Sequence, residues 1–190
     1  LRQPLEDGVI SINRVQSSCI YPARFMLVWA MNPCPCGFMN DTVKKCTCQP
    51  FQIERYRSRL SGPLLDRMDI FIHVPRVNVD EIANKWIPTT TSEEFREQVI
   101  YARERQLARL RETGKTSNAE MTNKDIDMFC VLDTASSELL QKAVQRLDLS
   151  TRAYYRTLKL ARTIADLAGS EDILSEHITE ALGYREKTQK

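Results

Sequence analysis

The sequence predicts an α/β part followed by an all-α part, because the spacing of its apolar residues changes near the middle of the chain. Up to about residue 75 these residues form short strand-like runs, and from about residue 92 they recur at helical spacing. The Pro-containing and Thr-rich stretch Ile87–Ser92 lies between the two patterns. We therefore expect a first domain at residues 1–75, a linker at 76–91 and a helical domain at 92–190.

The first part opens with a predicted β-hairpin. Val9–Arg14 and Cys19–Pro22 are strand-like, and the polar stretch Gln16–Ser18 between them is typical of a turn. Next, Phe25–Met31 is a continuous apolar run that ends abruptly at Asn32 and Pro33. Such a run is typical of a strand that is buried on both faces of a parallel sheet.

A second apolar run, Ile70–Val74, ends at Pro75, and we expect it to join the same sheet. His73 alternates with apolar residues in this run, and His177 lies near the end of the chain. Neither histidine has a neighbour that implies catalysis, so we expect structural roles for both.

The second part predicts about five helices. Thr91–Glu94 forms a capping box, and the helix after it is expected to reach Arg111, before the stop signal at Gly114. A looser capping box at Thr122–Asp125 starts the next helix. Three further helices are expected at Ala135–Leu147, Thr151–Ala168 and Ser175–Tyr184.

The helix from Thr151 has two distinct faces. Its predicted buried stripe contains Ala153, Leu158, Ala161, Ile164, Ala165 and Ala168. Arg152, Arg156 and Lys159 recur at spacings of four and three on another face. From the charge pattern alone this is a solvated basic face.

Overall composition is that of a soluble globular protein. The 190 residues are 42% hydrophobic and contain no long apolar run, so we expect no membrane span. A net charge of +2 gives no support to a strongly basic nucleic-acid coat, and any nucleic-acid contact would have to be local. The start Leu1–Pro4 has neither an initiator Met nor a signal sequence, so we expect a piece of a longer cytoplasmic protein.

Four of the six cysteines form two close pairs, namely Cys34 with Cys36 and Cys46 with Cys48. Reduced thiols in such pairs suit a tetrahedral, soft-ligand metal, and four thiolates would close the shell of a structural zinc. The C-x-C spacing is less diagnostic than C-x-x-C, so two disulfides or free thiols remain alternatives. Cys130, in an apolar stretch, is expected to be a small core residue.

The sequence contains one misleading nucleotide motif. Thr113–Thr116 has the Gly-Lys-Thr ending of a phosphate-binding loop, but Arg109 stands where the loop needs its first glycine. The stretch also follows a helix instead of a strand. We therefore expect no phosphate-binding loop here, and we expect this chain by itself not to hydrolyse ATP.

Several longer motifs resemble the bacterial magnesium-chelatase-like AAA+ family of ComM and YifB. They are Leu1–Gly8, Ala30–Gly37 (AMNPCPCG), Tyr56–Asp69 (YRSRLSGPLLDRMD), Ala153–Arg156 and Ala161–Leu167. The resemblance covers essentially the whole chain. It implies the C-terminal part of an ATPase core, with a pre-sensor-1 hairpin, parallel strands and a four-cysteine loop, followed by a helical lid domain. Walker A and Walker B would precede this chain.

The resemblance also implies roles for individual residues. Asn32 matches sensor 1, where its amide can orient the attacking water beside the γ-phosphate; the alternative is a turn-forming Asn before Pro33. Arg67 matches the arginine finger, with Asp66 orienting it, and its fixed charged fork can neutralise phosphoryl oxygens in a neighbouring subunit. Arg57 and Arg59 are weaker candidates for the same contact.

In the lid, Arg152 matches sensor 2 and would bind the nucleotide of its own subunit. Arg156, one turn further on, is expected to pair with acids. In the hairpin of residues 9–24, which commonly points into the ring's pore in this branch, Arg14 and Arg24 are candidate DNA-backbone contacts. One departure is Trp29, which stands where the family tends to have a small residue.

The family resemblance implies a homo-oligomeric ring, expected to be a hexamer, that hydrolyses ATP with Mg²⁺ in the full-length protein. Its expected work is DNA remodelling or branch migration. The alternative is a chelatase-like or chaperone-like ATPase that remodels a protein partner, because the fold does not decide between them. The Cys pairs stand where the family has them, which favours zinc.

Overall fold

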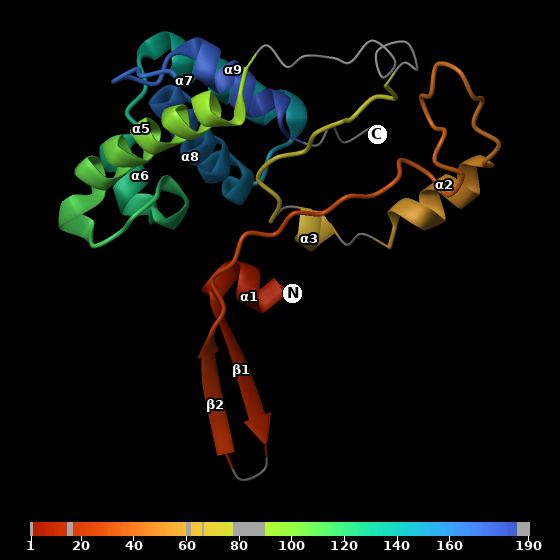
Figure 1. The fold of residues 1–190 in the computed structure, drawn as a ribbon, viewed down its shortest axis with the longest axis horizontal. Helices are drawn as coiled ribbons and strands as arrows, with labels where there is room; N and C mark the ends of the chain where they lie inside the picture. The colour runs from red at the N-terminus through yellow and green to blue at the C-terminus, as the bar shows by residue number, and fades with distance from the viewer. Residues whose placement is uncertain (1, 15–16, 60–61, 66, 78–89, 186–190) are drawn as a thin grey trace. The chain divides into compact units, whose positions relative to one another are not determined.

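The computed structural model describes residues 2–14, 17–59, 62–65, 67–77 and 90–185 (Figure 1). The chain divides into two units. The N-terminal unit contains Leu1–Met68 and Val74–Arg76, and the C-terminal unit contains Asp69–His73 and Val77–Lys190. The predicted linker at 76–91 falls largely on residues 78–89, which lie outside the described residues.

A β-hairpin follows the first short helix of the N-terminal unit. Helix α1 (Arg2–Asp7) leads into β1 (Val9–Arg14), which pairs antiparallel with β2 (Ser17–Pro22). Gly8 turns the chain between α1 and β1 at a φ of +65°, a conformation that glycine adopts without steric cost. The predicted hairpin is thus confirmed, although the residues between its strands lie outside the described part.

The prediction of two parallel strands is wrong for this structure. Phe25–Met31 and Ile70–Val74 are not strands, and the sheet found among the described residues consists of β1 and β2 alone. Met26 is 87% exposed and Ile72 is 72% exposed. A strand needs a ladder of hydrogen bonds with a neighbouring strand, and among the described residues neither run has one.

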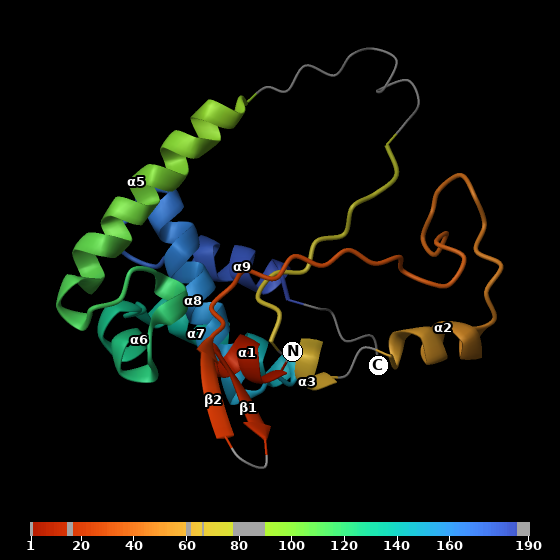
Figure 2. The ribbon, with the colours of Figure 1, turned by 60° about the horizontal axis from the view of Figure 1, so that its bottom comes forward.

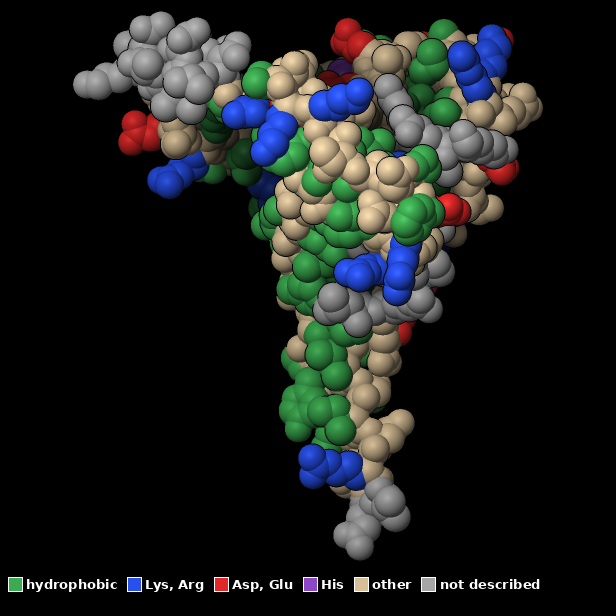
Figure 3. Space-filling view, turned by 90° about the vertical axis from the view of Figure 1, so that its right-hand side faces the viewer, with side chains coloured by type: hydrophobic (Ala, Val, Ile, Leu, Met, Phe, Trp, Pro, Cys, Tyr) green, Lys and Arg blue, Asp and Glu red, His purple; other side chains and the backbone are tan. Residues whose placement is uncertain are grey.

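The remaining helices of the N-terminal unit are short. Helix α2 (Pro50–Arg57) follows the cysteine loop and buries none of its residues, and α3 (Gly62–Leu65) is a single turn. The hairpin also exposes apolar side chains, visible along its length in Figure 3. These side chains are Ile10, Ile12, Ile20 and Tyr21.

Among the residues that the structure describes, the C-terminal unit contains five helices and two short 3₁₀ turns (Figures 1 and 2). They are α5 (Ser92–Leu110), η1 (Arg111–Thr113), η2 (Asn118–Glu120), α6 (Asn123–Phe129), α7 (Thr134–Leu147), α8 (Thr151–Leu167) and α9 (Ser175–Gly183). Both predicted capping boxes are present, at Thr91 with Glu94 and at Thr122 with Asp125. The helical half of the fold is therefore confirmed.

The hydrophobic core of this unit is built around α8. Leu110, Leu140 and Ile178 from α5, α7 and α9 pack in one cluster with Ala161 and Ala165 of α8. The predicted stripe of α8 is confirmed at five positions, namely Ala153, Leu158, Ala161, Ile164 and Ala165. Ala168 is exposed because it lies just beyond the end of the helix. Cys130 is buried in the same cluster, as predicted.

None of the helices that the structure describes has the length and apolarity that a crossing of the lipid bilayer requires.

Candidate functional site

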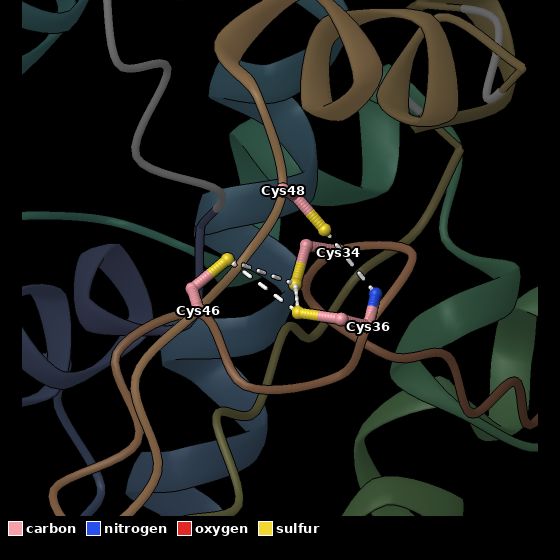
Figure 4. A group of neighbouring side chains, drawn as sticks. All are labelled: Cys34, Cys36, Cys46 and Cys48. Atoms are coloured by element: carbon pink, nitrogen blue, oxygen red, sulfur yellow. Dashed lines mark hydrogen bonds between the residues drawn. The ribbon is translucent and has the colours of Figure 1, made fainter.

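Four cysteine side chains of the N-terminal unit converge on one point (Figure 4). The Sγ atom of Cys34 lies 3.4 Å from that of Cys36 and 3.7 Å from that of Cys46. Cys36 and Cys46 are 3.5 Å apart at sulfur, and all four Sγ atoms lie within 4.8 Å of one another. No disulfide links them. The predicted pairing of the two C-x-C motifs in space is confirmed.

These distances fit a tetrahedral metal. A Zn–S bond of about 2.3 Å places neighbouring ligands about 3.8 Å apart, close to the sulfur separations of 3.4–3.7 Å among Cys34, Cys36 and Cys46. Four cysteines leave no open position for a substrate, so the donor set suits a structural metal. The four cysteines can therefore hold a metal such as zinc.

Backbone amides already favour a thiolate in the cluster. Hydrogen bonds from the backbone of Phe38 and Thr47 lower the pKa of Cys36 to about 5. Burial raises the pKa of Cys48 to about 12, although its sulfur accepts a hydrogen bond from the Cys36 amide at 3.3 Å. Further thiolates beside the first are unfavourable unless a cation binds them, and metal binding displaces these protons.

Local turns give the loop its shape. Gly37 donates from its amide to the Cys34 carbonyl at 3.0 Å and has a φ of +83°, which favours glycine. Further along, the Asp41 carboxylate accepts hydrogen bonds from the amides of Val43 and Lys44, each at 2.8 Å. These bonds lower the pKa of Asp41, and they close the turn that returns the chain toward Cys46.

Asn32 lies directly beside the cysteine loop, residues 33–48. A Cβ atom at Gly37 would be 3.7 Å from the Asn32 Cγ atom and 3.8 Å from its Nδ2 atom. The Asn32 amide is therefore adjacent to the turn that carries the first cysteine pair. Asn32 also helps to line an open hollow of about 540 Å³ with Trp29, Ala30, Met31, Tyr56 and Arg59.

Arg67, the predicted arginine finger, is held within the N-terminal unit. Its side chain is 11% exposed and forms an ion pair with Glu6 of α1. Asp66, the predicted orienting acid, lies outside the described residues. Of the weaker candidates, Arg57 contacts the Met39 sulfur at 3.6 Å. Sequence reasoning missed Glu6, because 61 residues separate it from Arg67 and no local motif links them.

Arg152 belongs to the C-terminal unit, whereas Asn32 and Arg67 belong to the N-terminal unit. Arg152 is exposed in the first turn of α8, which begins after the N-cap Ser150. One turn later, Arg156 forms an ion pair with Asp69, in keeping with the expected pairing with an acid. Burial, with help from the nearby Arg156 charge, lowers the pKa of Lys159, whose Nζ donates to the Ala119 carbonyl at 3.1 Å.

The misleading Gly-Lys-Thr stretch has a structural role. Gly114 ends η1 at a φ of +67°, and Lys115 forms an ion pair with Asp125 at 2.7 Å. His177 is buried, and its Nδ1 atom accepts a hydrogen bond from the Leu174 amide at 3.0 Å. Both contacts fix ends of helices rather than reacting groups.

A buried ionic network joins α5 to α8. Asp166 accepts hydrogen bonds from Arg109, Arg162 and Asn118. Arg162 also donates to the backbone carbonyls of Ser170 and Glu171. The i,i+4 spacing of Arg162 and Asp166 on one helix could have indicated their ion pair from the sequence, but the pair was not predicted.

Two family models together match most of the chain. The model described as "Magnesium chelatase, subunit ChlI" matches residues 1–82, and that described as "Magnesium chelatase, subunit ChlI C-terminal" matches residues 89–185.

Individual proteins are similar over nearly the whole chain. Competence protein ComM of Haemophilus influenzae is 46% identical over 185 residues, which is 97% of this chain and 35% of that protein. The uncharacterized proteins YifB of Escherichia coli and of Salmonella typhimurium are 40% and 38% identical over the same shares. The chain thus spans about a third of the length of the curated relatives that it matches.

Proposed function

The chain belongs to the magnesium chelatase family that includes ComM and YifB, and from this premise we propose that it is part of a ring-forming ATPase that remodels DNA. The observation that carries the proposal is the 46% identity with a competence protein over 97% of the chain. That relative is named for competence, and on this basis we propose DNA as the substrate. The activity is proposed for the complete protein, of which this chain is a part.

In this proposal three side chains act on ATP bound with Mg²⁺ in the full-length protein. The Asn32 amide orients the attacking water, and the Arg67 guanidinium neutralises charge on phosphoryl oxygens of a neighbouring subunit in a ring, expected to be a hexamer. Arg152 senses the nucleotide from the lid. Arg67 is paired with Glu6 of its own chain and is 11% exposed, so in this proposal its guanidinium exchanges Glu6 for the phosphoryl oxygens of the neighbouring subunit.

Zinc in the four-cysteine cluster would be structural in this proposal. The sulfur separations and the all-thiolate donor set support that reading. A closed thiolate shell supplies folding free energy to the loop and takes no part in hydrolysis.

The charge distribution supports a local DNA contact. Residues 1–68 contain nine Lys and Arg against five Asp and Glu, a formal charge of +4 within a nearly neutral chain. Arg14 and Arg24 lie at the distal end of β1 and just after β2. We propose that they bind the DNA backbone, which makes the affinity depend on salt.

A second candidate is a protein-remodelling ATPase of the same family. The exposed apolar face of the hairpin, with Ile12 at 46% and Tyr21 at 53% exposure, favours it because nucleic-acid backbones offer little apolar surface. Nucleotide-dependent capture of a protein without DNA affinity would support this second function.

The proposed function is tested by ATP hydrolysis of the full-length protein, with and without branched or single-stranded DNA. We expect DNA to stimulate turnover and Arg67→Ala to lower it by roughly 10³-fold or more, as for other arginine fingers. Arg152→Ala should also lower turnover. The exposed Arg96→Ala is the matched control and should leave turnover within about twofold of wild type. Turnover that ignores DNA and survives both substitutions would favour the protein-remodelling function.

A further inference from the structure

The turn that carries the first two cysteines lies against the Asn32 side chain. Gly37 closes this turn with its hydrogen bond to Cys34, and its missing Cβ atom would point at the Asn32 amide 3.7 Å away. Cys34 itself has no exposed surface. The Asn32 side chain is exposed but has this turn as a neighbour, so a shift of the turn changes the space open to the amide on that side.

The loop is held by turns and side-chain contacts and contains no regular secondary structure. Residues 23–49 contain no helix or strand, and α2 begins at Pro50, two residues after Cys48. The first cysteine pair follows the segment with Asn32, and the second pair leads into α2. A cation bound by all four sulfurs would tie these two segments together, and closing a loop of this kind contributes folding free energy.

We propose that the four-cysteine centre is the device that positions Asn32. Binding of a divalent cation by the four thiolates fixes the position of the turn at residues 33–37. This turn then fixes the position of the Asn32 side-chain amide. Cys34, Cys36 and Gly37 are then positioning residues that do not touch the nucleotide. The inference rests on the proposed function in one respect, namely that this amide serves ATP hydrolysis.

The first test measures the coupling without any activity. The 190-residue chain is labelled with ¹⁵N-asparagine, and Zn²⁺ and then a chelator are added under reducing conditions. We expect the side-chain amide signals of Asn32, assigned by their loss in Asn32→Ser, to shift with one equivalent of Zn²⁺ and to return with chelator. Asn118 is the matched control, because it is buried in the C-terminal unit. Its signals should not move.

Cobalt binding shows whether the thiolates are occupied. The proposal would be overturned if Co²⁺ gave its thiolate absorption band, which shows that the cysteines bind it, while the Asn32 side-chain amide signals did not move. Failure of the reduced chain to bind either ion would overturn it as well, because the positioning device would not exist.

The second test uses a substitution that leaves all four cysteines in place. Gly37→Ala puts a methyl group against the Asn32 amide and strains the backbone at a φ of +83°. In the full-length protein we expect kcat for ATP hydrolysis to fall about tenfold to a hundredfold, with nucleotide Kd within about twofold of wild type. Gly114→Ala has the same kind of strain at a φ of +67° with no atom within 4 Å, and kcat should be unaffected.

The double variant separates this inference from the proposed function. If Asn32→Ala lowers kcat and adding Gly37→Ala lowers it no further, both substitutions act through Asn32. If Asn32→Ala leaves kcat unchanged, the role of Asn32 in the proposed function is wrong, whereas the amide signals still decide the coupling. Equal and additive losses from the two substitutions would overturn the inference alone.

Discussion

At the scale of single residues, Asp166 is a fully buried charged group of the C-terminal unit with several hydrogen-bond partners. Its side chain has no exposed surface and accepts hydrogen bonds from Arg109 at 2.9 Å and from Asn118 at 2.8 Å. Burial raises the pKa of this carboxyl, but the hydrogen bonds and the charges of Arg109 and Arg162 hold it below its ordinary value. The carboxylate is therefore more stable in the folded chain than in the unfolded one.

Replacing Asp166 with alanine should strongly destabilise the C-terminal unit. The change leaves Arg162, whose side chain is 3% exposed, without its carboxylate, and uncompensated buried charge costs about 3–5 kcal/mol. The difference in free energy of unfolding between this variant and wild type should be largest near pH 7. It should shrink as the pH falls below about 4, because Asp166 of the unfolded wild-type chain then takes up a proton while the folded carboxylate, whose pKa is lowered, stays ionised to lower pH. Urea unfolding of the variant and of wild type at pH 7 and at pH 3 measures this difference in free energy of unfolding at each pH.

The control is Glu138→Gln, which breaks an exposed i,i+4 pair with Lys142. Such pairs contribute about 0.3–0.5 kcal/mol. An Asp166→Ala effect as small as that of Glu138→Gln at pH 7 would show that the network is not important for stability.

At the scale of helices and strands, local signals predicted far more than non-local ones. The capping boxes at Thr91 and Thr122 gave correct helix starts, because a cap is formed by residues three apart. The runs Phe25–Met31 and Ile70–Val74 were predicted wrongly as paired strands. Their apolar composition is suitable, but pairing depends on a distant neighbour that composition cannot identify.

Two glycines at helix ends should respond oppositely to alanine. Gly169 follows α8 at a φ of +72°, and a Cβ atom there would meet no atom within 4 Å. Gly169→Ala should therefore destabilise the unit by about 1 kcal/mol through backbone strain alone. Gly183, in the last turn of α9, has equal space and no positive φ. Gly183→Ala should be neutral or stabilise by up to about 1 kcal/mol.

Thermal or urea unfolding of the two variants beside wild type checks this prediction. Neither added methyl group contacts a neighbour, so a difference in stability between the two variants comes from the backbone conformation at the two positions. Equal effects in the same direction would contradict the assignment of strain to Gly169.

At the scale of the whole molecule, the sequence predicted the composition of the candidate site better than its contacts. The cysteine spacing correctly indicated a cluster, since each pair is joined by one residue and both lie in one loop. The adjacency of Gly37 to Asn32 and the ion pair of Arg67 with Glu6 were not predicted. Both depend on how turns bring side chains together, which a pattern of residue types does not encode.

Metal removal should affect the two units unequally. The buried cluster of the C-terminal unit runs from Leu110 to Ala181 and contains none of the four clustered cysteines, so we expect its stability not to depend on the cysteine loop. Hydrogen exchange of the zinc-loaded chain, compared with the chelated chain, should show faster exchange in residues 33–48 after chelation and unchanged exchange in α8. Cys34→Ser should reproduce the effect of the chelator, whereas the exposed Cys19→Ser should not. If α8 lost as much protection from hydrogen exchange as residues 33–48, the stability of the C-terminal unit would depend on the metal. Its hydrophobic core would then not be sufficient to stabilise the unit.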